Sequence, residues 1–282
     1  MPAPQSIETA PGLRLVQGRH GWMLAHAADF YIGRSFIRYG ECCEQEVQFL
    51  LQLLRAGGTV VEVGANIGTH TVPLARALAA QQRRLLAYEP QPAMFQTLCA
   101  NLAVNGIGNV VAQAAACGAE PGTLYFDAPD YRARGNFGGV AMQREAAAGR
   151  TAVRCLRLDD ELGGERVGLL KIDVEGFELD VLRGAAGTLA RCRPLLYLEN
   201  DRAEQSQALI EWLWAAGYAL WWHFPRLFNP DNFAGDGENL FGDIASYNML
   251  ALPREAGTQV QGLAAITDSR QHPSLGQRKR QQ

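Results

Sequence analysis

The stretch TVVEVGANIGTHTVPLARAL, from Thr59 to Leu78, decides the fold of this chain. It begins with a β-branched apolar run, continues through a turn that contains Gly64 and Gly68, and ends in the spacing of an amphipathic helix. We therefore predict a buried parallel strand, a glycine turn where backbone comes close to a ligand, and a helix that packs back on the sheet.

The same turn indicates which kind of cofactor binds. Its glycines are spaced GxxxG, whereas the dinucleotide-binding pattern is GxGxxG. Glu62 lies two residues before Gly64, and a diphosphate is usually bound by helix N-terminal amides with no carboxylate nearby. A carboxylate at this position favours a cofactor with a cationic head group. S-adenosylmethionine, which carries an ammonium and a sulfonium, fits this requirement. The alternative of a nicotinamide oxidoreductase is weakened by Glu62 and by the missing GxGxxG pattern.

The next strand supports this interpretation. Residues Leu85 to Tyr88 are apolar and are followed by Glu89, at the place where a doubly wound domain uses an acid to bind ribose hydroxyls. Pro90 and Pro92 then end the strand and begin a helix. An ordinary tight turn in a doubly wound domain is the alternative.

Strands continue to alternate with helices along the chain, which favours a parallel sheet wound on both faces. The further predicted strands are 110–114, 167–172, 195–198, 218–224 and 244–252, and the further helices are 41–55, 177–189 and 203–216. Residues 123–127 and 152–158 alternate apolar and polar side chains, so we predict an antiparallel pair there.

Five segments together resemble a known family. They are VVEVGANIGTH (60–70), AYEP (87–90), LRLDD (156–160), LLKIDVEGFELDVLRGA (169–185) and YLEND (197–201). Over about Asp29 to Pro253 the chain resembles the FkbM-type family of S-adenosylmethionine-dependent methyltransferases. The resemblance implies a class I methyltransferase fold of the α/β class: a doubly wound, Rossmann-like, mostly parallel seven-stranded sheet with a terminal antiparallel strand. It also implies methyl transfer to an oxygen of a carbohydrate, glycolipid or natural product.

The domain organisation follows from these boundaries. We predict a leader at 1–28, a methyltransferase domain at 29–256 with a helical lid at about 41–56, and a tail at 257–282. The tail is polar and basic, so we predict that it is disordered, with contact to a protein or an anion as the alternative.

Composition limits the function classes. With 48% hydrophobic residues the chain can bury one full core, and its net charge of −3 gives no electrostatic reason to bind nucleic acid or a membrane. No run of 18 apolar residues and no signal-peptide pattern is present, so we expect a cytoplasmic protein with no membrane span. Its six cysteines form no CxxC pair and are expected to be reduced thiols. Lys171 is unusual because it places a charged side chain inside a strand that is predicted to be buried.

The resemblance also implies which residues hold the cofactor. Glu62, Gly64 and Asn66 would bind its methionine end, Glu89 its ribose, and Ala115 with its neighbours its adenine. The other predicted cofactor contacts are Ala65, Gly68, His70, Pro90 and Asp173.

For the transfer step, an acceptor hydroxyl must lie in line with the methyl group and lose its proton. Asp173 and Glu175 lie at a strand end and His223 closes a later strand, so these three are the catalytic candidates. The alternative for His223 is a histidine stacked among aromatic residues. Asp173 is thus a candidate for two roles, one in catalysis and one in cofactor binding.

The acceptor, a small molecule or a glycan, is expected to contact the loop from Phe224 to Gly242, where asparagines alternate with phenylalanines. The predicted substrate-binding residues are Asn229, Asn232, Glu199 and Asn200. The alternative for the loop is a structural role, in which its own phenylalanines hold it on the core.

Three residues at predicted strand ends offer oxygen ligands for a metal ion. Asp173, Glu199 and Asn200 are similar to the magnesium site of catechol-type methyltransferases, and oxygen ligands suit Mg²⁺. Glu199 stands where that site has aspartate, and we predict that no metal is required.

Two rival functions remain: an N-methyltransferase of the same fold, and a non-catalytic module that binds S-adenosylmethionine. The oligomeric state is left open.

Overall fold

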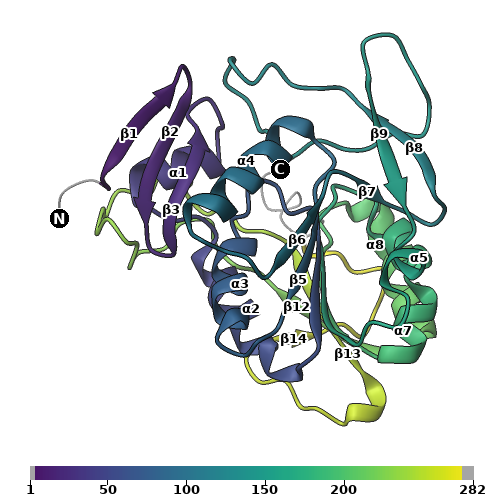
Figure 1. The fold of residues 1–282 in the computed structure, drawn as a ribbon. Helices are drawn as coiled ribbons and strands as arrows, with labels where there is room; N and C mark the ends of the chain where they lie inside the picture. The colour runs from purple at the N-terminus through teal and green to yellow at the C-terminus, as the bar shows by residue number, and fades with distance from the viewer. Residues whose placement is uncertain (1–3, 275–282) are drawn as a thin grey trace, which may run out of the picture.

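The computed structural model describes residues 4–274, and a central eight-stranded sheet organises the molecule (Figure 1). The strand order is β14-β12-β13-β11-β10-β4-β5-β6. The strands are β4 (Thr59–Val63), β5 (Leu85–Tyr88), β6 (Val110–Gln113), β10 (Val167–Ile172), β11 (Leu195–Glu199), β12 (Tyr218–His223), β13 (Asn248–Pro253) and β14 (Ala264–Ala265). The pairs among β6, β5, β4, β10 and β11 are parallel, and β13 is antiparallel to both its neighbours. This confirms the predicted α/β fold; β14 adds a short strand at the edge.

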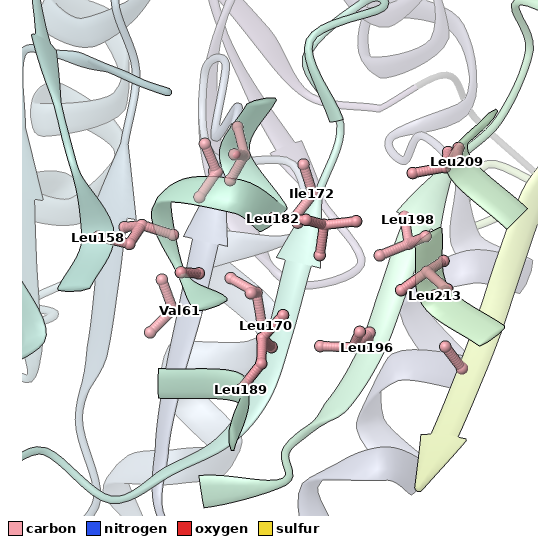
Figure 2. Packing of buried hydrophobic residues seen from close by; sticks show 14 of the residues in the cluster. Val61, Leu158, Leu170, Ile172, Leu182, Leu189, Leu196, Leu198, Leu209 and Leu213 are labelled. Carbon is pink, nitrogen blue, oxygen red and sulfur yellow. The ribbon is translucent and has the colours of Figure 1, made fainter. Parts of the chain in front are cut away.

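Helices cover both faces of the sheet (Figure 1). On one face lie α2 (Glu44–Leu53), α3 (Thr71–Ala79) and α4 (Pro92–Val104). On the other lie α5 (Leu158–Leu162), α6 (Glu178–Gly184), α7 (Ala186–Cys192) and α8 (Ala203–Ala215). Because both faces are covered, neighbouring residues of one strand enter different cores, as Leu169 and Leu170 do. Figure 2 shows Leu170 and Leu196 packed with Leu189 and Leu213 in one of them. This explains why the central strands are apolar at most positions, with Glu62 of β4 and Lys171 of β10 as charged exceptions.

The predicted helix 177–189 is two short helices, α6 and α7, which meet at Ala185. Asp159 fixes the start of α7, because its carboxylate accepts hydrogen bonds from the backbone amides of Gly187 and Thr188 at 2.8 and 2.7 Å. A side-chain cap from elsewhere in the chain therefore breaks a helix that the local pattern predicts as continuous.

The residues predicted as a leader contain a small antiparallel sheet, which the sequence pattern does not predict. It consists of β1 (Ser6–Ala10), β2 (Leu13–Gly18) and β3 (Gly21–His26), followed by α1 (Ile32–Tyr39). Asn101 of α4 and Asn105, which caps the end of α4, fasten it, since their side chains accept hydrogen bonds from the backbone amides of Leu24 and Trp22 at 2.6 and 3.1 Å. This tertiary attachment explains why residues 5–26 form structure.

The disorder predicted for the tail is corrected for residues 264–274. Ala264 and Ala265 pair with β12, and Ile266 is buried beside the main core. The ring of His272 is also buried, and its Nε2 lies 2.7 Å from the carbonyl oxygen of Asn200. Burial of a few apolar groups within a polar segment is the reason for the difference. The basic residues at 278–280 lie outside the described residues.

A second small sheet stands beside the edge of the main one. In it β9 (Thr151–Leu156) is antiparallel to β8 (Gly122–Phe126), as predicted, and parallel to β7 (Ala116–Cys117). The predicted strand 244–252 begins only at Asn248, so residues 244–247 are loop. Within residues 4–274, no helix is long and apolar enough to cross a membrane.

Candidate active site

A cavity opens at the carboxyl ends of the central parallel strands, where this architecture places ligands. Strand ends supply Val63, Gly64, Glu89, Asp173 and Glu199 to its wall. Further lining residues come from the turn after β4 (Ala65, Asn66, Thr69, His70), from β7 (Ala116, Cys117), from segment 136–142, and from α1 and α2 (Ile32, Glu46). Most of the predicted cofactor residues are therefore brought together at one edge of the sheet.

Gly64 allows the carboxyl ends of β4 and β10 to lie close together. Its φ is +85°, a conformation that side chains disfavour, and a Cβ atom there would lie 1.8 Å from the carbonyl oxygen of Asp173. Asp173 in turn donates its amide to the carbonyl of Val63 at 3.0 Å. Any larger residue at position 64 would separate the ends of β4 and β10.

Glu89 is fixed by the turn that it faces. Its two carboxylate oxygens accept hydrogen bonds from the backbone amides of Asn66 and Gln91, each at 2.8 Å. Burial raises its pKa to about 7, although these amides oppose the shift. Each oxygen can accept a second hydrogen bond, so the carboxylate is an oriented acceptor for two neighbouring hydroxyls.

Glu62 lies behind the cavity wall, at 0% exposure, and does not line the cavity. Its Oε2 accepts from the hydroxyl of Thr71 at 2.7 Å, and its Oε1 lies 3.7 Å from the Nζ of Lys171. Lys171 is 1% exposed and also contacts Asp173, with 3.2 Å between Nζ and Oδ2. The unusual lysine of the sequence is thus the counter-ion of strand-end carboxylates.

Carboxylates also gather at the mouth of the cavity. Oxygens of Glu175, Glu199 and Asp201 lie within 4.8 Å of one another, and Arg202 forms ion pairs with Glu175 and Asp201. Burial and the neighbouring acids, Asp173 first, raise the pKa of Glu175 to about 8. The same causes raise the pKa of Glu199 well above its usual range. The cluster is therefore able to hold and exchange protons near neutral pH.

Several predicted site residues lie elsewhere. His223 stacks on Phe49 with ring centroids 4.3 Å apart, and its Nδ1 lies 2.8 Å from the hydroxyl of Tyr197. Burial lowers the pKa of His223. It does not line the cavity, and neither do Gly68 and Ala115, although Thr69 and Ala116 beside them do.

The predicted acceptor loop is fastened by its own polar groups. Asn229 donates to Oε1 of Glu41 at 2.7 Å, and Asn232 donates to the carbonyls of Asn229 and Asp236 at 3.0 and 2.7 Å. Neither asparagine lines the cavity. The end of the same connection does reach it, through Ser246.

The trio considered for a metal is not assembled. The side-chain amide of Asn200 is buried and donates to Oγ of Ser206 and to the sulfur of Met249. It points into the packing between α8 and β13, whereas Asp173 and Glu199 line the cavity.

Three regions line the cavity although the sequence did not predict them as part of the site: Tyr31 and Ile32, Cys43 and Glu46, and the segment around Asn136 and Gly138. One signal was available for Glu46. It is an acid next to Val47 and near Leu50, on a helix that must bury its apolar face. The other two regions are loops or short helices without a periodic pattern.

Comparison with known proteins identifies the family. The sequence profile of the methyltransferase FkbM domain matches residues 62–220, more than half of the chain. The chain belongs to the FkbM methyltransferase family. The class I methyltransferase fold predicted from the sequence is thereby confirmed, with β5 to β11 wholly inside the matched region and β4 and β12 at its two ends.

Relatives with curated names match only part of the chain. Methyltransferase 1 of Beauveria bassiana is 34% identical over 146 residues, which cover 44% of this chain and 57% of the relative. The hexuronic acid methyltransferase AglP of Haloferax volcanii is 26% identical over 150 residues, covering 52% and 58%. The chain thus spans little more than half the length of these relatives. The crystal structure of methyltransferase FkbM from Methylobacillus flagellatus superposes with a TM-score of 0.47 at 15% identity, covering 70% of this chain and 44% of that one.

Proposed function

We propose that this protein is an S-adenosylmethionine-dependent methyltransferase that methylates a hydroxyl oxygen of a carbohydrate, glycolipid or natural product. The observation that carries the proposal is the fixed carboxylate of Glu89, which faces the same cavity as the strand-end acids Asp173 and Glu175. Membership of the FkbM family supports it. The name of the Haloferax relative, which is said to act on a hexuronic acid, favours a sugar acceptor.

The cavity residues fit the cofactor. Glu89 would accept the two ribose hydroxyls, and the apolar side chains of Ala116 and Cys117 would contact the adenine. Gly64 lets the turn approach the ligand closely, and Asn66, with φ of +50°, continues that turn. Glu62 would act through its charge from behind the wall. When bound, S-adenosylmethionine supplies the electrophilic methyl group and leaves as S-adenosylhomocysteine.

The acceptor would reach the methyl group through a groove beside the cavity. The groove shares Asn136, Gly139, Glu175, Glu199 and Ser246 with the cavity and continues past Arg202. These residues, and not Asn229 or Asn232, are our candidates for contact with the acceptor. This assigns to Glu199 the substrate role predicted from the sequence and withdraws it from Asn200.

Acceptor activation is assigned to Asp173 and Glu175. As the oxygen–methyl bond forms, the hydroxyl proton must pass to a base within hydrogen-bond reach. Both carboxylates line the cavity, and a group whose pKa is about 8 exchanges protons readily at physiological pH. His223 receives no role in this mechanism, because it is stacked away from the cavity.

Two measurements test the proposal. Isothermal titration calorimetry should detect binding of S-adenosylhomocysteine and not of NAD. A transfer assay with methyl-labelled cofactor should then be run against matched acceptors: sugars with hydroxyls only, uronic acids, and amines without hydroxyls. Labelling of the hydroxyl compounds supports the proposal. Labelling of amines alone would make the protein an N-methyltransferase, and binding without any transfer would favour a non-catalytic module.

A further inference from the structure

Two helices that flank the central sheet place polar side chains at one end of the cavity. Glu46 comes from the first turn of α2, and Thr69 and His70 precede α3. All three are at most 7% exposed, and all three line the cavity. Glu46 was not among the residues predicted to bind anything.

These side chains lie close together but leave hydrogen-bonding capacity unused. His70 Nε2 lies 3.4 Å from Oε1 of Glu46, and His70 Nδ1 lies 3.9 Å from Oε1 of Glu62. His70 Nε2, Thr69 Oγ1 and Glu62 Oε1 are buried and have no hydrogen-bond partner among the described residues. An unpaired buried polar group costs about 1 to 3 kcal/mol, so the two that line the cavity, on Thr69 and His70, indicate a polar ligand there.

The charge of the site indicates what kind of ligand fits. Lys171 contacts Glu62 and Asp173, and its charge also acts on Glu46. Three carboxylates therefore share one buried ammonium. Burial and Lys171 lower the pKa of His70 well below its usual value, so His70 is neutral and does not supply the missing charge. A second cation is complementary to this arrangement.

Resting on the function proposed above, we propose that Glu46 binds the α-ammonium group of S-adenosylmethionine, while Thr69 and His70 donate hydrogen bonds to its α-carboxylate. An amino-acid end has a cation and an anion two bonds apart, which matches acceptors and donors set side by side. The helix before the sheet thereby completes the cofactor site, in addition to covering it.

The test compares two ligands that differ by the amino-acid end. S-adenosylhomocysteine has this end, and 5′-methylthioadenosine lacks it. In calorimetry, Glu46→Gln should weaken binding of S-adenosylhomocysteine by about 10- to 100-fold, the range of a charged hydrogen bond. Binding of methylthioadenosine should change little. Thr69→Val should give a smaller loss with the same selectivity for the first ligand.

Glu44→Gln is the matched control. Glu44 is a buried glutamate of the same helix turn, but its carboxylate is paired with His20 and Gln48 and does not line the cavity. It should leave the affinity for both ligands unchanged. If Glu46→Gln does not fold, as judged by its melting transition, Glu46→Asp keeps the charge beside Lys171 and should lose affinity in the same selective way.

The outcomes separate this inference from the proposed function. Equal affinity of wild type and both Glu46 variants for S-adenosylhomocysteine would overturn the inference and leave the proposed function standing. An equal loss for both ligands would overturn it too, because Glu46 would then be structural. Wild-type protein that binds neither ligand would contradict the proposed function itself.

Discussion

Replacement of Lys171 by methionine tests the charge arrangement beneath the site. The lysine is 1% exposed, and its ammonium lies 3.2 Å from an oxygen of Asp173 and 3.7 Å from an oxygen of Glu62. Although burial opposes it, the nearby acids raise the pKa of Lys171, so the lysine is charged at neutral pH. Methionine has a similar length and no charge. We expect Lys171→Met to leave two strand-end carboxylates without their counter-ion.

The expected loss of stability depends on how deeply the two partners of Lys171 are buried. Breaking a buried ion pair by removing one partner destabilises proteins by about 3 to 5 kcal/mol, whereas an exposed pair contributes about 0 to 1 kcal/mol. Glu62, at 0% exposure, belongs to the first class, and Asp173, whose side chain is 37% exposed, lies between the two. We therefore expect a loss of about 3 kcal/mol in the free energy of unfolding at pH 7.5.

The loss should depend on pH with a definite sign. Burial already raises the pKa of Glu62 in the folded protein, and loss of the lysine raises it further. Above the unfolded pKa of a glutamate the folded state then holds more protons than the unfolded state, so stability falls as pH rises. The variant should accordingly lose less stability at pH 5 than at pH 7.5.

Urea unfolding at both pH values, followed by circular dichroism, measures these quantities. Glu62→Gln in the Lys171→Met background should recover part of the loss, because it removes the stranded charge. A loss below about 1 kcal/mol at pH 7.5, the range of an exposed pair, would refute the reasoning, as would a loss that does not grow with pH.

Three further predictions concern the candidate site. Glu175→Gln should reduce the transfer rate by about 10²-fold or more and abolish any rise of the rate with pH near 8. A His223→Asn variant should keep most of the activity. If rate measurements show the reverse ranking of the two variants, His223 is the base. Asn229→Ala should lower the free energy of unfolding by about 1 to 2 kcal/mol, because it removes a hydrogen bond to Glu41. The variant should still use the acceptor as the wild type does. Weakened acceptor use with unchanged stability would instead place the loop in the acceptor site. Transfer should survive excess EDTA, because the oxygens of Asp173, Glu199 and Asn200 are not assembled; loss of turnover that Mg²⁺ restores would contradict this.

The gathering of most candidate cofactor residues at one edge of the sheet could be predicted because it is local. Gly64, Asn66 and Glu89 belong to one strand-helix-strand unit, in which strand spacing and turn chemistry place residues close in sequence at one edge. The acceptor half could not be predicted in the same way. His223 and Asn229 have residue types suited to the role, but their direction depends on Phe49 and Glu41, which are more than 150 residues away along the chain.

Short-range patterns in the sequence predicted the sheet, the alternation of strands with helices along the chain, and the acids at the strand ends, because hydrophobic periodicity and glycine turns act over a few residues. Long-range packing places Glu62 against Lys171 and not in the cavity, brings Glu46 from α2 to the cavity, and holds residues 264–274 against the sheet. Each of these depends on which distant groups share a buried volume. A side chain's partner there is set by packing, which short-range patterns do not encode.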